Sequence, residues 1–179
     1  MREQASASLS ANASSNGIMA ESGSSRRQGK DLSSSLPSPS EKTSSQQRLH
    51  ILVVEDNKAD VFLIREAIDS ASLDAELHVM PDGEKAIRYF HDVDGDDAKA
   101  CPALVIIDIN LPRRSGGEVL EQMRKSRRCA SARVVIVTSS DSARDRDEMA
   151  RLGADAYFRK ASDYEAFLKL GGIVKSLID

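Results

Sequence analysis

Long hydrophobic runs are missing from this sequence. Its uninterrupted apolar stretches reach only four to six residues, whereas a membrane-spanning helix needs about 20. The first 20 residues also lack the apolar segment that a secretory signal requires. We therefore expect a cytoplasmic protein with no membrane partner.

Cysteine is scarce as well, because the chain contains only Cys101 and Cys129. Two cysteines are too few for the disulfide framework of a small secreted domain. They also lack the companion ligands of a structural zinc site, which uses four Cys or His side chains. We expect both to be free thiols.

The composition changes at Arg48. Residues 1–48 contain fifteen serines, no valine and no aromatic residue, with six basic and four acidic side chains. Such a segment cannot bury enough apolar surface to offset the entropy lost on ordering. We predict a disordered serine-rich tail, either a regulatory or linking arm or a dispensable extension.

The domain is then 49–179, with nineteen basic and twenty-four acidic residues. This acidic balance argues against nucleic-acid binding.

Short apolar runs alternate with amphipathic stretches throughout the domain. We predict strands, each apolar on both faces, at residues 51–54, 76–79, 103–107, 134–137 and 156–158. We predict helices at residues 57–71, with Asn57 as the N-cap, and at 83–91, 116–127, 142–152 and 164–178. This pattern indicates a doubly wound α/β fold with a parallel sheet covered on both faces. Gly171 and Gly172 each cost about 1 kcal/mol in a helix, so we expect the last helix to be the least regular.

Acidic side chains follow two of the predicted strands. Glu55 and Asp56 follow the first strand and Asp108 follows the third. The carboxyl ends of parallel strands form one edge, where such sheets bind ligands. Neighbouring carboxylates repel one another unless a cation or a proton intervenes, and Mg²⁺ prefers oxygen ligands and retains several waters. We predict an Mg²⁺ site with Asp56 and Asp108 as direct ligands, Glu55 acting mostly through water, and the Asn110 backbone carbonyl.

Two further polar residues are expected at the same edge. Thr138 ends the fourth strand and Lys160 follows the fifth. An aspartate beside a bound metal can attack phosphorus and form an acyl phosphate. Asp108 is the candidate nucleophile, and the metal, the Thr138 hydroxyl and Lys160 would neutralise the phosphoryl oxygens.

These residues, in this order, resemble the receiver domain of two-component response regulators, and the resemblance covers the whole of 49–179. Three segments are similar to stand-alone regulators that accompany bacterial phytochrome-type kinases. They are Val53-Val54-Glu55-Asp56-Asn57 with Asp60-Val61-Phe62-Leu63-Ile64, Asp108-Ile109-Asn110-Leu111-Pro112, and Phe167-Leu168-Lys169-Leu170-Gly171. The resemblance implies a flavodoxin-like sheet with strand order 2-1-3-4-5.

The resemblance also implies a function for the site. Asp108 would accept a phosphoryl group from a phosphohistidine on a sensor histidine kinase, with Mg²⁺ bound. Thr138 and Lys160 would move toward the phosphoryl group and Tyr157 would turn inward, which changes the surface of the fourth helix and fifth strand. Asn110 and Ser140 would tune the lifetime of the acyl phosphate. The domain would not otherwise be an enzyme.

Two departures from the family pattern bear on this expectation. Ala161 occupies the position where the family usually has a proline joined by a cis peptide bond, and a cis bond before a non-proline residue costs about 2.5–4 kcal/mol. Lys160 is therefore expected to be aimed less rigidly. Nothing follows the last predicted helix, so we expect output through an unknown downstream protein or through a homodimer.

Two alternative functions remain open. An aspartyl-phosphate phosphohydrolase on a similar sheet needs a second acid two residues after the nucleophile, where this chain has Asn110. A degenerate receiver that binds partners without phosphorylation is favoured only by Ala161.

Residues 92–97 lack the glycine and the glutamate of a calcium loop, which predicts a solvated turn. The basic residues at 124–128 are explained by the favourable effect of cations at a helix C-terminus.

Overall fold

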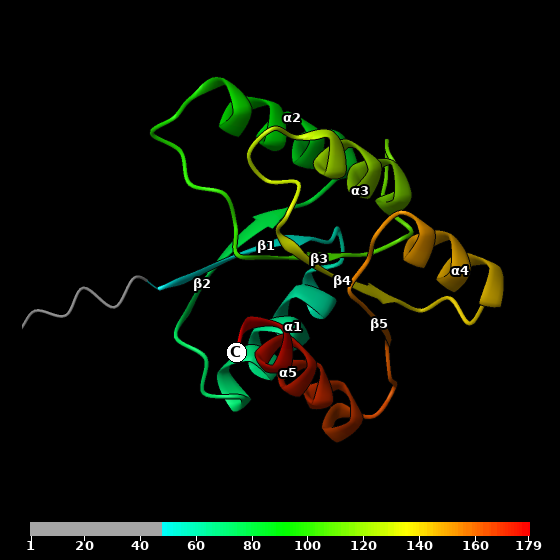
Figure 1. Ribbon diagram of the computed structural model, residues 1–179. Helices are drawn as coiled ribbons and strands as arrows, with labels where there is room; N and C mark the ends of the chain where they lie inside the picture. Colours follow the sequence, from blue (N-terminus) through cyan, green and yellow to red (C-terminus); the bar gives the residue numbers. More distant parts are fainter. Residues whose placement is uncertain (1–47) are drawn as a thin grey trace, which may run out of the picture. The chain divides into compact units, whose positions relative to one another are not determined.

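The structure is a computed structural model that describes residues 48–179 (Figure 1). The predicted tail, except for Arg48, lies outside the described residues. Five parallel strands form one sheet in the order β2-β1-β3-β4-β5. They are β1 (Leu49–Val54), β2 (Ala75–Met80), β3 (Leu104–Ile107), β4 (Arg133–Thr138) and β5 (Ala156–Arg159). The predicted doubly wound α/β fold and its strand order are confirmed.

Helices cover both faces of this sheet (Figure 1). The helices α2 (Gly83–Gly95), α3 (Gly116–Lys125) and α4 (Ala143–Arg151) lie on one face, and α1 (Lys58–Ser70) and α5 (Tyr164–Ile178) lie on the other. Side chains alternate across each strand, so Leu52 and Val54 pack toward α2 and α3, whereas Ile51 and Val53 pack toward α1 and α5. Both faces of the central strands are therefore buried, which explains their continuous apolar sequences.

The helix starts follow local sequence signals. The Asn57 side chain accepts a hydrogen bond from the Ala59 N–H, as predicted for the N-cap of α1. At α3, Ser115 and Glu118 form a capping box. None of the helices within residues 48–179 combines the length and apolar character that crossing a lipid bilayer requires.

The expectation for the last helix is wrong. α5 is a continuous α-helix of 15 residues, and it runs through both glycines. Gly171 is buried against α1, where a Cβ atom would collide with the carbonyl oxygen of Ala67, whereas a Cβ at Gly172 would meet open space. Close packing against α1 thus outweighs the low helix propensity of glycine.

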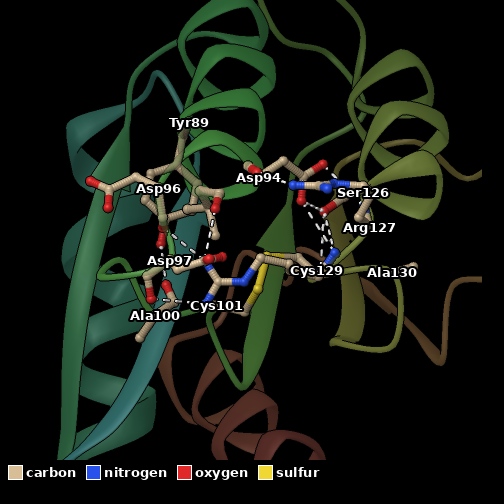
Figure 2. The surroundings of a disulfide bond; sticks show 12 residues. Tyr89, Asp94, Asp96, Asp97, Ala100, Cys101, Ser126, Arg127, Cys129 and Ala130 are labelled. Atoms are coloured by element: carbon tan, nitrogen blue, oxygen red, sulfur yellow. Dashed lines mark hydrogen bonds and ion pairs between the residues drawn. A yellow bond between two sulfur atoms is a disulfide. The ribbon is translucent and has the colours of Figure 1, made fainter.

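The expectation of free thiols is also wrong, because Cys101 and Cys129 form a disulfide (Figure 2). Cys101 precedes β3 and Cys129 precedes β4, and these strands are neighbours in the sheet. The two Cα atoms are 5.4 Å apart, within the range that a disulfide spans. A count of two cysteines excluded a framework of several bonds, but it carried no information on their separation in space.

The segment predicted as a solvated turn begins as the last turn of α2, which ends at Gly95. Asp94 accepts hydrogen bonds from the Ser126 hydroxyl at 2.8 Å and from the Arg127 N–H at 3.1 Å. Arg124, from the basic cluster, donates to the carbonyl oxygens of Ala130 and Ala132, both at 2.7 Å. The contacts of Asp94 hold the end of α2 to the end of α3, and those of Arg124 hold α3 to the segment before β4.

Candidate functional site

Three carboxylates meet at the carboxyl ends of the central strands. Glu55 and Asp56 follow β1, Asp108 follows β3, and oxygen atoms of all three lie within 4.8 Å of one another. Glu55 and Asp108 are buried and Asp56 is exposed. They line an open pocket of about 500 Å³, whose other walls are Asn57, Asp60, Ser139, Lys160, Ala161 and Ser162.

The ammonium of Lys160 lies at the centre of this acidic cluster. Its Nζ donates hydrogen bonds to Glu55 Oε2 at 2.8 Å and to Asp60 Oδ2 and Asp108 Oδ2, both at 2.9 Å. Burial disfavours the ammonium, but these three hydrogen bonds outweigh burial and raise the pKa of Lys160. The side chain is therefore fixed by carboxylates on three sides although Ala161 follows it.

Burial acts on the pKa of Glu55 in the direction opposite to its effect on Lys160, because it disfavours the charged form of each group. Its removal from water raises the pKa of Glu55, while hydrogen bonds from Lys160 and from the Asn57 N–H oppose that change. The Asn57 N–H lies 3.1 Å from Glu55 Oε1. One end of the Glu55 carboxylate thus contacts the start of α1 and the other contacts Lys160.

The composition of the pocket suits a divalent cation. Four carboxyl groups, those of Glu55, Asp56, Asp60 and Asp108, face the single ammonium of Lys160. The donors are all oxygen atoms, which hard divalent cations prefer. A bound cation would offset the remaining negative charge, so the residues that are present fit a divalent metal.

The backbone around Asp108 is fixed by close packing. Its N–H donates to the Val54 carbonyl, and its Oδ1 accepts a hydrogen bond from the Asn110 N–H at 3.3 Å. A Cβ atom at Gly116, the first residue of α3, would collide with the Asp108 carbonyl oxygen. Glycine at this position lets α3 begin directly against the backbone of Asp108.

The two residues predicted near the end of β4, Thr138 and Ser140, differ in burial and in the direction of their side chains. Thr138 is fully buried, and its Oγ1 accepts a hydrogen bond from the Ser140 N–H at 3.2 Å. Ser139, which the sequence did not single out, lines the acidic pocket. The Ser140 hydroxyl instead donates to Asp145 in α4 at 2.5 Å. The structure therefore directs the Ser140 side chain to α4.

Tyr157 lies in β5 on the side of the sheet that faces α4. Its hydroxyl donates to the Ser140 carbonyl at 3.2 Å, and the guanidinium of Arg146 lies 5.1 Å from the ring centre. Partial burial and the nearby Asp145 carboxylate raise the pKa of Tyr157. The ring is half-buried and connects β5 with the segment between β4 and α4.

Asp60 is the charged site residue that sequence reasoning missed. It lies in the first turn of α1 and also accepts a hydrogen bond from the Asn57 side chain at 3.2 Å. An acid in this turn has an ordinary explanation, because it interacts favourably with the helix dipole. Its position one turn after Glu55-Asp56 was the signal that could have placed it at the same edge of the sheet.

Comparison with known proteins agrees with this geometry. The family model of the response regulator receiver domain matches residues 51–170. Response regulator Rcp1 from Synechocystis sp. is 29% identical over 120 residues, a match that covers 67% of this chain and 82% of Rcp1.

Two solved structures share the fold. The phosphorylated cyanobacterial phytochrome response regulator RcpA has a TM-score of 0.66 at 29% identity, covering 74% of this chain and 95% of RcpA. The Mn²⁺-bound form of Rcp1 has a TM-score of 0.63 at 28% identity, covering 71% of this chain and 91% of that structure. Together with the acidic edge of a 2-1-3-4-5 sheet, the matches show that this chain belongs to the response regulator receiver family and is similar to its phytochrome-associated members.

Proposed function

We propose that Asp108 is a phosphoacceptor that takes a phosphoryl group from a phosphohistidine on a sensor histidine kinase. The observation that carries this proposal is the contact between the Asp108 carboxylate and the ammonium of Lys160, in a pocket open to solvent. In the transfer, an Asp108 oxygen forms a bond to phosphorus and the bond between phosphorus and the kinase imidazole breaks. The imidazole nitrogen keeps the electron pair of that bond.

We propose Mg²⁺ as the cation of this site, held by Asp56 and Asp108 directly, by Glu55 mostly through water and by the Asn110 carbonyl. When bound, Mg²⁺ supplies positive charge to the phosphoryl oxygens. Lys160, which donates to Asp108 Oδ2, would provide a second positive charge. The phosphoryl group of an acyl phosphate carries nearly two negative charges, whereas the free Asp108 carboxylate carries one. This added charge would draw Lys160 away from its other carboxylate partners.

The signal would leave the site through β4, α4 and β5. Phosphorylation would move the Thr138 hydroxyl toward the phosphoryl group and change the segment that contains Ser140. Because Tyr157 bonds to the Ser140 carbonyl, a shift there would release the ring and change the surface beside Arg146. A downstream protein or a second copy of this chain would read that surface. Asn110 would tune the phosphate lifetime. Ser140 would do so only after its hydroxyl leaves Asp145.

The proposal includes a cytoplasmic location, where ATP supplies the phosphoryl group of a histidine kinase. It takes residues 49–179 as the receiver domain.

Incubation with acetyl phosphate and Mg²⁺, followed by electrophoresis that retards phosphoproteins, tests the acceptor. We expect one labelled species that is lost with EDTA and with the Asp108→Asn variant. Asp147→Asn, an exposed aspartate on α4, is the matched control and should keep the label. Labelling that survives Asp108→Asn would contradict the proposal.

A phosphorylation-independent receiver is the competing function. Beryllofluoride, which mimics an acyl phosphate, separates the two. A change in amide exchange around residues 138–146 on adding beryllofluoride and Mg²⁺ supports the proposed switch. If partner binding and exchange both stay unchanged, the phosphorylation-independent function replaces it.

A further inference from the structure

The Cys101–Cys129 disulfide lies at the end of the sheet opposite the acidic pocket. Cys101 lies between α2 and β3, and Cys129 lies between α3 and β4, so both precede the strands whose far ends carry Asp108 and Thr138. The chain has only these two cysteines. Neither sulfur can therefore form a different bond within the chain.

Only one of the two residues is accessible from solvent. Cys129 is 1% exposed and belongs to the core between the sheet and α3. Cys101 is partly exposed and lines an open pocket of about 430 Å³. The other residues of this pocket are Arg48, Leu49, His50, Glu76, Ala100 and Ala103. A thiol from solvent can thus approach Cys101, while the core shields Cys129.

The polar contacts around Cys129 do not involve either sulfur atom (Figure 2). The Asp94 carboxylate accepts from the Ser126 hydroxyl and from the Arg127 and Arg128 N–H groups, at 2.8 to 3.2 Å. Arg128 donates to the Val93 and Asp96 carbonyls, both at 2.8 Å. These contacts join the end of α2 to the end of α3, so this junction is expected to survive cleavage of the disulfide.

The segment on the Cys101 side is held more weakly. The hydrogen bond from the Tyr89 hydroxyl to the Ala100 carbonyl is long, at 3.4 Å. The Ala98 and Lys99 N–H groups bond to the nearby Asp96, and the Lys99 ammonium forms only a long, exposed ion pair with Asp92 at 3.9 Å. The next strong link to the sheet is the Ala103 N–H, which donates to the His50 carbonyl at 2.9 Å. Pro102 is buried, so the disulfide is the main tether of residues 98–101.

We propose that Cys101–Cys129 is a thiol–disulfide exchange site for a dithiol reductant. One thiolate of the reductant attacks the Cys101 sulfur, the bond between the two cysteines breaks, and Cys129 leaves as a thiolate that takes a proton. The second thiolate of the reductant then attacks the first reductant sulfur, which is bonded to Cys101 in the mixed disulfide. This attack releases the Cys101 thiolate, which is also protonated. The reductant leaves as a disulfide, so two electrons and two protons have reached the protein.

Reduction would free residues 98–101 while the fold is retained. This segment forms one wall of an adjacent pocket, to which it contributes Lys99 and Ala100 beside His50, His78 and Tyr89. The redox state would thus change the surface at the amino-terminal end of the sheet. A bond of this kind in a reducing compartment is usually transient rather than permanent.

The first test uses the full chain in its native state. After air oxidation, denaturation and treatment with a maleimide polymer, we expect no label on the oxidised protein. After prior incubation of the folded protein with dithiothreitol, we expect two labels per chain, at reductant levels that leave the far-ultraviolet circular dichroism unchanged. Amide exchange should increase in residues 98–101 and stay slow in β3 and β4. Two labels on the air-oxidised protein, or reduction only after unfolding by denaturant, would each overturn the proposal.

A second test identifies which sulfur is attacked, first in the unsubstituted protein and then in two variants. Glutathione disulfide added to the reduced protein gives mixed disulfides, and peptide mass spectrometry locates them. We expect glutathione on Cys101, and its predominance on Cys129 would overturn the proposed order of attack. Cys129→Ser and Cys101→Ser, checked for folding by circular dichroism, form a matched pair in which only the former should react rapidly with maleimide. These measurements do not involve phosphorylation, so they are independent of the function proposed for Asp108.

Discussion

The ammonium of Lys160 lies 2.9 Å from an Asp60 oxygen, the same distance at which it contacts Asp108. An ammonium has three hydrogen-bond donors, and Glu55, Asp60 and Asp108 account for all three. A phosphoryl group on Asp108 must therefore displace one of these carboxylates to reach Lys160. Asp60 is the candidate for displacement because it is more exposed than Glu55 or Asp108.

We predict that Asp60→Ala binds beryllofluoride severalfold more tightly than the parent chain in the presence of Mg²⁺. The substitution frees one Lys160 donor and removes a negative charge from beside the phosphoryl position. Titration calorimetry provides the affinity. Asp69→Ala, an exposed aspartate near the other end of α1, is the control. Weaker binding by Asp60→Ala would mean that Asp60 positions Lys160 rather than competing for it.

Replacement of Lys160 should destabilise the metal-free protein. Lys160→Ala leaves the buried Glu55 without its cation, and removing one partner of a buried ion pair costs about 3–5 kcal/mol, with less expected in an open pocket. The pKa of Glu55, already raised by burial, should rise further. Urea unfolding measures the loss. Arg159→Ala, which removes only an exposed pair with Asp141, should have a small effect.

The pH dependence of this variant follows from the sign of the Glu55 shift. A carboxyl with a raised pKa in the folded state binds protons more readily than in the unfolded chain. Its contribution to stability is therefore gained as the pH falls and lost as the pH rises through the folded pKa. The stability difference between Lys160→Ala and the parent should narrow as the pH falls from neutrality. A constant difference would count against Glu55 as the group responsible.

Magnesium should raise the midpoint of thermal unfolding through the acidic cluster. Ligand at about 100 times its dissociation constant stabilises the folded state by about 2.7 kcal/mol. We predict that Asp56→Asn loses most of this increase, because Asp56 is a proposed direct ligand. Asp147→Asn should respond as the parent does. If Asp56→Asn keeps the full response, the metal binds elsewhere.

The adjacent glycines of α5 should respond to alanine in opposite directions. Gly171→Ala forces a Cβ against the Ala67 carbonyl, and overpacking of this kind costs about 1–3 kcal/mol. Gly172→Ala enters open space at an exposed helical position and should stabilise the protein by about 0.5–1 kcal/mol. Urea unfolding of both variants gives the comparison. Equal effects would contradict the packing described between α1 and α5.

His50 should make the protein less stable in mild acid. Burial and the neighbouring His78 lower the pKa of His50 in the folded state. The folded protein then binds fewer protons than the unfolded chain, so stability falls as the pH drops below about 6.5, the ordinary histidine value. His50→Gln should weaken that dependence, whereas His91→Gln, an exposed histidine on α2, should not. Identical pH profiles for His50→Gln and the parent would contradict this.

Hydrophobic pattern was sufficient to predict the fold class, whereas the strand order was predicted from the family resemblance. Ile51 to Val54 and Leu104 to Ile107 are buried on both faces of the sheet, and only a covered parallel sheet accommodates such runs. The acids that follow them could be placed together for the same reason, since parallel strands end at one edge.

The features that the sequence did not reveal are contacts between residues that are far apart along the chain and close in space. Propensity gave no sign that Gly171 meets the Ala67 carbonyl, and cysteine counting gave no sign that residues 28 apart in sequence meet before neighbouring strands. Ser139 and Ser140 differ by one position, yet only the former lines the pocket. Which of two consecutive serines faces a site depends on the backbone after β4, which the apolar pattern does not describe.

The contact between Gly116 and the Asp108 carbonyl limits how this site can vary. Any larger residue at 116 would push on the backbone of Asp108 rather than on a movable side chain. In a saturation mutagenesis screen for phosphorylation, position 116 should tolerate substitution as poorly as the acids themselves, although it has no functional group. A designer who grafts this acidic edge onto another sheet would therefore also need a glycine at the position that corresponds to Gly116.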